Sequence, residues 1–117
     1  MSNRHSLPVL PHAPFDLIAV SIDGFHVILA WTECGSGGLG FRIERADGIG
    51  SGCRFSEVGG TGPHVAAFHD GSVKPRTAYS YRVHAWNASG DSAPTNVVEV
   101  TTPQAKTKPT ADRNNLR

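Results

Sequence analysis

Charged residues are scarce in this sequence, and helix-forming runs are missing from it. Only 18% of its 117 residues are Asp, Glu, Lys or Arg, and it has no long run of Ala, Glu, Lys and Leu. Because helical bundles are built from such runs, the composition disfavours a bundle. Gly and Pro are plentiful by comparison, with 13 and 8 residues. This balance favours strands joined by turns.

Long hydrophobic runs are missing as well. No stretch approaches the roughly 18 consecutive apolar residues that a membrane helix needs, so we expect no insertion into a membrane. Residues 1–14 contain Arg4, His5 and three prolines, and they lack the apolar core of a signal peptide. At 117 residues the chain has room for one domain and not for two.

Cysteine is limited to Cys34 and Cys53. A strand expected over residues 40–46 places these two residues in loops at opposite ends of a segment of roughly 20 Å. Because a disulfide needs Cα atoms within about 7 Å, we predict two separate thiols. The pair also lacks the Cys-x-x-Cys or Cys/His spacing of a zinc site.

Charge divides the chain into three parts. Residues 13–102 hold six Lys or Arg against nine Asp or Glu, whereas the two ends together hold five Lys or Arg and one acid, Asp112. Both ends are polar and interrupted by proline, so they bury too little apolar surface to order on their own. We expect an N-terminal extension over residues 1–12, a domain over residues 13–102 and a basic tail over residues 103–117. We also expect that removing either end leaves the thermal stability unchanged.

Short alternating segments separated by turn residues fill the domain, a pattern typical of a β-sandwich. It predicts seven strands, over residues 15–20, 26–32, 40–46, 54–58, 64–69, 79–87 and 96–101, with a turn at residues 59–63. The predicted core comprises Trp31, Phe41, Phe68, Tyr79, Tyr81 and Val83, with Leu17, Val27, Leu29, Ile43, Phe55, Val73, Ala85 and Val98 or Val100.

The segment from Val73 to Asn87 is the most informative part of the sequence. A sharp loop leads into an alternating strand that begins with Tyr79, which is the layout of a corner between the two sheets of a sandwich. We predict that the Tyr79 hydroxyl bonds to the backbone near residues 73–75.

Taken together, these features resemble a fibronectin type III domain over about residues 12–103. The matching residues are Trp31, Phe41 to Arg45, Phe68, Asp70, Val73, Pro75, Thr77, Tyr79, Tyr81, Val83, Ala85, Asn87, Gly90 and Ser92. The resemblance implies a seven-stranded immunoglobulin-like β-sandwich, with residues 15–20, 26–32 and 64–69 in one sheet and the other four strands in the second. It also implies no metal, no cofactor and no catalytic group, with function on loops or on one sheet face. The Gly-rich, short-looped style is similar to that of prokaryotic and phage-borne members.

One sheet face carries the best candidate interface. Arg82, His84 and Trp86 alternate outward on one predicted strand, beside Arg42 and Glu44 on another. A tryptophan flanked by arginine has the composition of a binding hot spot, and aromatic faces also stack on sugars. The alternative is that Trp86 only covers the sheet, with arginine stacked over it. Lys106, Lys108 and Arg113 of the basic tail are further candidate contacts.

Catalytic and metal-binding patterns are weak. His26 and His69 are expected on neighbouring strands, but with no third ligand evident a solvent-exposed pair is favoured over a metal site. The carboxylates of Glu33, Asp47, Asp70 and Asp91 fall in predicted turns, where Asp commonly caps backbone N–H groups. No serine lies in a nucleophile elbow. We expect no enzyme activity and no nucleic-acid partner.

Two functions fit these observations. The first is a structural or decorating protein of a large assembly such as a virus particle, whose tails and sheet face dock on capsid or tail proteins. The second is an accessory spacer or weak carbohydrate-binding module of a secreted bacterial polysaccharide-degrading enzyme or adhesin. We favour the first, because the chain begins with Met1, lacks a signal peptide and has polar extensions on both sides. The expected location is a virion surface or the extracellular space.

Overall fold

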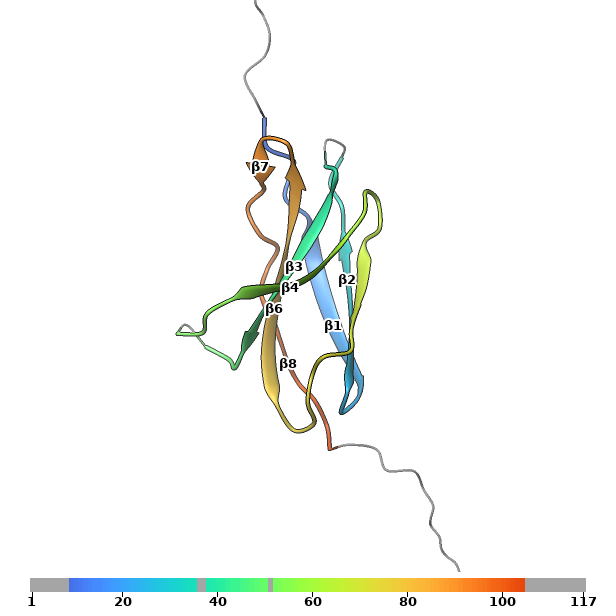
Figure 1. Cartoon of the computed structure of the whole chain (residues 1–117), viewed down its shortest axis with the longest axis vertical. Helices are drawn as coiled ribbons and strands as arrows, with labels where there is room; N and C mark the ends of the chain where they lie inside the picture. The colour runs from blue at the N-terminus through green and yellow to red at the C-terminus, as the bar shows by residue number, and fades with distance from the viewer. Residues whose placement is uncertain (1–8, 36–37, 51, 105–117) are drawn as a thin grey trace, which may run out of the picture.

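The computed structural model describes residues 9–35, 38–50 and 52–104, which form two packed antiparallel sheets (Figure 1). One sheet has the order β1-β2-β5, and the other has the order β4-β3-β6, with β7 and β8 both paired to β6. The strands are β1 (Phe15–Asp23), β2 (His26–Thr32), β3 (Gly40–Asp47), β4 (Ser56–Thr61), β5 (Ala67–Asp70), β6 (Ala78–Asn87), β7 (Gly90–Asp91) and β8 (Val98–Thr101). The predicted β-sandwich is confirmed. Over the described ranges, no helix has the length and apolar character needed to cross a membrane.

Alternate side chains of the strands point between the two sheets and form the core. The buried residues are Leu17, Val27, Leu29, Trp31, Phe41, Ile43, Val73, Tyr79, Tyr81, Val83 and Ala85, and Phe68, Val98 and Val100 pack against them while partly buried. Trp31 and Phe41 meet edge to face across the sheets, with ring centroids 5.3 Å apart. Such a pair adds about 0.5–1.5 kcal/mol beyond its buried area.

Phe55 corrects the predicted core. It precedes β4 instead of lying within it, and it remains outside the buried cluster. Its ring lies 4.2 Å from the guanidinium carbon of Arg82, a side chain that alternates away from the core on β6. Phe55 therefore packs on the surface of the second sheet, beneath an arginine.

The corner at the start of β6 has the predicted geometry. The backbone N–H of Lys74 donates to the Tyr79 hydroxyl oxygen at 2.8 Å, which confirms the expected link to the preceding loop. Thr102 strengthens this corner, because its hydroxyl oxygen accepts the N–H of Thr77 at 3.0 Å. The loop and the end of the last strand are thereby tied together.

A second link joins the two sheets through the buried carboxylate of Asp70, at the end of β5. The Tyr81 hydroxyl, on β6 in the other sheet, donates to its Oδ2 at 2.7 Å, and Arg45 Nη1 donates to the same oxygen at 3.1 Å. The backbone N–H and hydroxyl of Ser72 donate to Oδ1 at 2.9 and 2.6 Å. Burial alone raises the pKa of Asp70, but these hydrogen bonds outweigh it, so the pKa lies below its ordinary value.

The first strand is longer than predicted, because residues 21–23 continue it. Its register is set by a bulge: Phe15 pairs with Thr32 and Ile18 with Ala30, which leaves two residues of β1 opposite one of β2. Asp16, at the bulge, has φ +54°, a conformation that Asp adopts more readily than most residues. The bulge turns Leu17 into the core and Ile18 to the outside.

The predicted turn at residues 59–63 is also corrected. β4 continues through Gly59 and Gly60 to Thr61 and pairs with β3. A Cβ atom on Gly59 would overlap the ring of Phe68, so glycine here admits a core side chain beneath an edge strand. The two glycines serve close packing and not chain reversal.

The strand predicted over residues 96–101 begins later, as β8, and a further short strand, β7, precedes it outside the predicted range; both pair with β6. Pro94 lies between them and has no N–H to donate to a ladder. Hydroxyl groups replace the missing ladder partners: Ser92 accepts the N–H of Ala85 at 2.9 Å, and Thr95 accepts the N–H of Val83 at 3.0 Å. The backbone N–H groups of β6 therefore keep hydrogen-bond acceptors between β7 and β8.

The segment before β1 packs against the β6–β7 hairpin. The side-chain amide of Asn87 donates to the carbonyl of Val9 at 3.0 Å, and Pro11 is buried. This contact argues against the expectation that residues 1–12 can be removed without loss of thermal stability. The first and last described segments, blue and red in Figure 1, lie at opposite ends of the sandwich.

Candidate protein-interaction surface

The outer face of the five-stranded sheet brings together the five residues predicted from β3 and β6. Arg42 lies opposite His84 in the β3–β6 register, and Glu44 lies opposite Arg82. The guanidinium of Arg42 stacks over the Trp86 ring, 5.0 Å from its centroid, and its Nε donates to Asp91 Oδ1 at 3.0 Å. Trp86 also lies against Gly40, where a Cβ atom would stand 3.0 Å from the indole nitrogen.

Glu44 is the centre of the charged part of this face. Its Oε1 accepts from Arg82 Nε at 2.6 Å and lies 2.9 Å from His84 Nε2. The other ring nitrogen of His84 donates to the carbonyl of Ser92 at 2.8 Å. Burial raises the pKa of Glu44, but the hydrogen bonds and charges of Arg82 and His84 lower it by more. The pKa of Glu44 is therefore below its ordinary value.

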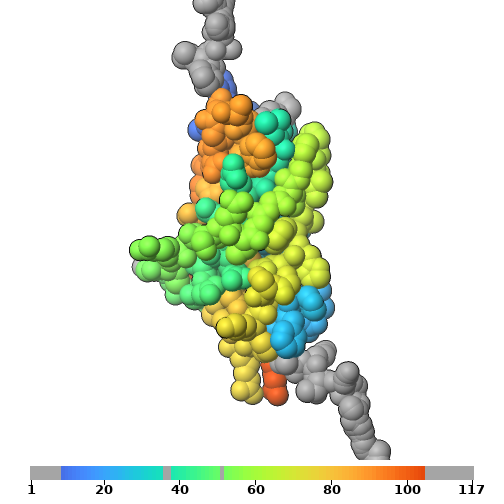
Figure 2. All heavy atoms as spheres, in the orientation of Figure 1, coloured from blue at the N-terminus to red at the C-terminus, as the bar shows by residue number. Residues whose placement is uncertain are grey.

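The charges of this face are thus paired within the chain, while two arginine–aromatic stacks, Arg42 on Trp86 and Arg82 on Phe55, cover its ends. The stacks present flat, partly desolvated surfaces, and arginine over an aromatic ring retains donors for a further partner. The β3–β4 hairpin, green in Figure 2, projects from the body beside this face. Lys106, Lys108 and Arg113 lie outside the described residues.

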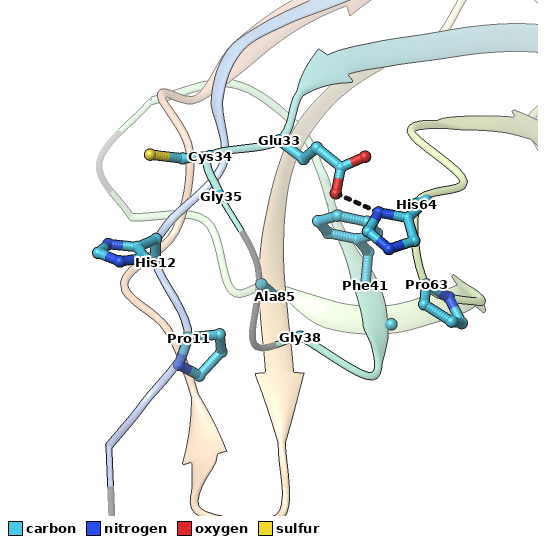
Figure 3. A pocket seen from close by; sticks show the side chains of 11 residues that line it. Pro11, His12, Glu33, Cys34, Gly35, Gly38, Phe41, Pro63, His64 and Ala85 are labelled. Atoms are coloured by element: carbon cyan, nitrogen blue, oxygen red, sulfur yellow. Dashed lines mark hydrogen bonds and ion pairs between the residues drawn. The ribbon is translucent and has the colours of Figure 1, made fainter.

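A small hollow at one end of the sandwich, about 50 Å³ in volume, opens to solvent. Phe41, Pro11 and Pro63 line it with apolar atoms. At its edge, Oε1 of Glu33 lies 3.0 Å from Nδ1 of His64. Figure 3 shows the thiol of Cys34 pointing away from this Glu33–His64 pair. The thiol and the imidazole are therefore not arranged as a nucleophile and its base.

The two histidines considered for a metal lie close together. The rings of His26 and His69 are 5.0 Å apart, and His26 Nδ1 lies 2.9 Å from Asp23 Oδ1. Within the described ranges, no group of three or more His, Cys, Asp or Glu side chains has an arrangement that could hold a metal ion. Cys34 is exposed and Cys53 half-buried, and both thiols are free.

Comparison with known proteins identifies the fold. No protein-family model matches the sequence, and no curated protein matches it either. The fibronectin type III domain of human fibronectin type III domain containing protein 3 superposes with a TM-score of 0.68 at 22% identity, covering 92% of this chain and 98% of that one. The chain has a fibronectin type III fold.

Two further structures agree with this assignment. The FN5 domain of Drosophila Lar gives a TM-score of 0.61 at 21% identity, covering 81% of this chain and 99% of that one. Domains A168–A170 from titin give a TM-score of 0.70 at 23% identity over 81% of this chain, which spans only 33% of that three-domain segment.

Sequence reasoning missed an apolar surface on the other sheet of this fibronectin type III fold. Ile18, Val20 and Ile22 alternate along β1 and are 59%, 57% and 56% exposed. The signal was present, because the large aliphatic residues occupy the even positions whereas Leu17 shows that the odd positions face the core. The strand predicted over residues 15–20 ends before Ile22, so the predicted alternation stops early.

Proposed function

We propose that this chain is a non-enzymatic protein-interaction module that builds or decorates a large assembly such as a virus particle. In this proposal the outer face of the five-stranded sheet docks on a neighbouring protein, with Arg42, Glu44, Arg82, His84 and Trp86 as its contacts. The basic residues Lys106, Lys108 and Arg113 are proposed as a second set of contacts, and the location is the surface of the particle.

The observation that carries the proposal is the pair of arginine–aromatic stacks on one sheet face. Tryptophan and arginine are the residue types most enriched at binding hot spots. The stacks at 5.0 and 4.2 Å hold both guanidinium groups in place before a partner arrives, which lowers the entropy lost on docking. The described ends of the chain, at opposite poles of the sandwich, leave this face unobstructed by the segments that lead to them (Figure 1).

Carbohydrate binding is less well supported by the same face. A sugar ring stacks on an open aromatic face, and Arg42 already lies over the Trp86 ring. Gly40 contacts the indole from the sheet. A sugar would have to displace the arginine and break its hydrogen bond to Asp91.

The proposal is tested by fractionating the source material that produces the chain. A tagged chain is expressed there, and particles are separated from free protein by density-gradient centrifugation. We expect the chain to sediment with a megadalton-sized particle. Sedimentation of the whole chain as free protein of about 12.4 kDa would overturn the proposal.

The docking face is tested with a matched pair of variants. Arg82→Ala removes one stack and the Glu44 partner, so we expect fewer copies per particle. Arg54→Ala removes an exposed arginine on the neighbouring hairpin and serves as the control. Equal occupancy for both variants, at unchanged melting temperature, would assign the contact to another surface.

A further inference from the structure

The outer face of the β1-β2-β5 sheet carries two imidazole rings side by side. Val27 is wholly buried, so its neighbours in β2, His26 and Ile28, face outward. His69 of β5 lies opposite Ile28 and shares this outer face. The β2–β5 register therefore places His26 and His69 diagonally across two neighbouring strands, and both side chains are reached from solvent.

A carboxylate fixes the orientation of the first ring. Nδ1 of His26 lies 2.9 Å from Oδ1 and 3.1 Å from Oδ2 of Asp23. The carboxylate accepts the Nδ1–H, which leaves the lone pair of Nε2 free in the neutral ring. Histidines that bind a metal ion almost always donate their other ring N–H to a carboxylate, a carbonyl or water. His26 therefore has the hydrogen bonding of a metal ligand that binds through Nε2.

The spacing of the two rings fits a shared ion. Zinc binds an imidazole nitrogen at about 2.0–2.1 Å, which places the centre of the ring about 3.2 Å from the ion. Two imidazoles that are about 109° apart around a tetrahedral ion therefore have centres about 5.2 Å apart. The centroids of His26 and His69 are 5.0 Å apart, and the ring planes are inclined by 57°. The rings are thus at the distance that one ion requires, and they are not stacked face to face.

The surroundings of the pair favour a cation. The carboxylate of Asp23 brings a negative charge next to the ring of His26. A Cβ atom on Gly71, two residues beyond His69, would lie 3.7 Å from Cδ2 of His26. The ring of His26 therefore leans toward the end of β5, the strand that carries His69.

We propose that His26 and His69 bind one divalent zinc ion through one ring nitrogen each, with water in the remaining positions. Imidazole nitrogen suits zinc, copper and nickel, whereas magnesium and calcium prefer oxygen ligands. Sequence alone favoured a solvent-exposed pair at this place, and the carboxylate on His26 and the ring spacing are the observations that favour a metal ion. The inference does not depend on the proposed function.

The number of protein ligands sets the character of the site. Catalytic zinc sites have three protein ligands and structural ones have four, and within the described ranges no larger group of His, Cys, Asp and Glu is arranged for a metal ion. A site with two protein ligands is therefore open, binds zinc reversibly and keeps positions for an outside ligand. The ion also joins β2 to β5, a four-residue strand at the edge of the sheet. Because the ion binds the folded chain, it should stabilise that chain by mass action.

The test is a zinc titration of the full chain without an affinity tag, followed by calorimetry and by NMR of the imidazole rings. We expect binding of zinc with shifts of the ring signals of His26 and His69, and a melting temperature that rises with zinc concentration. Magnesium at the same concentrations should give neither effect. A chain that binds no zinc, or ring shifts confined to His12 and His64 at the hollow, would overturn the proposal.

Matched variants locate the ion. His69→Gln removes one ligand and should weaken zinc binding by at least about tenfold, and Asp23→Asn, which retains an oxygen for the N–H of Phe25, should weaken it by about tenfold. His64→Gln is the control, because Nδ1 of His64 likewise faces a carboxylate, that of Glu33, at 3.0 Å. It should leave zinc binding unchanged, and circular dichroism verifies that each variant is folded. Equal zinc affinity of His69→Gln and the parent chain, or an equal loss in His64→Gln, would overturn the proposal.

Discussion

The link between the sheets at Asp70 makes the sharpest prediction for stability. Tyr81 is wholly buried, and Tyr81→Phe removes only the hydroxyl that donates to Asp70 at 2.7 Å. The Asp70 carboxylate, 3% exposed, then loses one of four donors but keeps Arg45 and Ser72. A hydrogen bond to a charged group contributes about 1.5–3 kcal/mol, so we expect the free energy of unfolding to fall by about 2 kcal/mol at pH 7.

The stabilisation that Asp70 contributes depends on pH. The folded chain holds the pKa of Asp70 below its ordinary value, and the unfolded value is about 3.9. The stabilisation is therefore present above about pH 4 and is lost as the pH falls through the lower pKa of the folded state. Without the tyrosine donor the folded pKa moves back toward the ordinary value, so the variant loses less stability in acid than the parent chain does.

Urea unfolding followed by tryptophan fluorescence, at pH 7 and near pH 3, measures both quantities. At pH 7 we expect the urea midpoint of Tyr81→Phe to lie below that of the parent chain, with an unchanged slope. Near pH 3 the difference in the free energy of unfolding between the two proteins should be smaller. Tyr79→Phe is the control, since its hydroxyl accepts from the neutral N–H of Lys74 and its loss of about 1 kcal/mol should not vary with pH. A gap for Tyr81→Phe under about 0.5 kcal/mol, or one of equal size at both pH values, would refute the reasoning.

Three further predictions concern packing and the chain edges. Gly59→Ala should lower the free energy of unfolding by about 1–3 kcal/mol in thermal denaturation, because its methyl group overlaps Phe68, and Gly62→Ala, where the space is open, is the control. Removal of residues 1–8 should leave the melting temperature unchanged, whereas removal of residues 1–12 should lower it. The longer deletion also removes buried Pro11 and the Val9 carbonyl that accepts a hydrogen bond from Asn87. Equal melting temperatures for the two shortened chains would contradict this prediction. Asn96→Ala should lower the free energy of unfolding by about 1–2 kcal/mol and speed amide hydrogen exchange in β1, because the side-chain amide of Asn96 bonds both the N–H and the carbonyl of Leu17. Unchanged hydrogen exchange in β1 would contradict this prediction.

Much of the fold is visible in local patterns of the sequence. The alternation of Val27, Leu29 and Trp31 and that of Tyr81, Val83 and Ala85 each place one row of side chains inward. The Tyr79 corner is also local, because its partner Lys74 is five residues away. These features depend on nearby residues, and for that reason the sequence alone predicts them.

The remaining features depend on residues far apart in the chain. Gly59 and Gly60 have the composition of a turn, and only the approach of Phe68 from another strand shows why they lie in β4. Asp70 likewise has the composition of a turn residue, although Arg45 and Tyr81 come from the opposite sheet to pair with it. At the candidate interface the five outward residues follow from alternation, but the Asp91 partner of Arg42 lies 49 residues away and has no local signal.

The opposite placement of the described chain ends has a mechanical consequence. β1 carries load from the first described segment and β8 carries load to the last, and these two strands contact each other across the sheets (Figure 1). Tension between the two poles therefore runs along the strands, and ladder hydrogen bonds, which lie across the strands, are loaded together in shear instead of being opened one after another. A chain pulled from its ends should yield abruptly, at a high force, and not by gradual peeling.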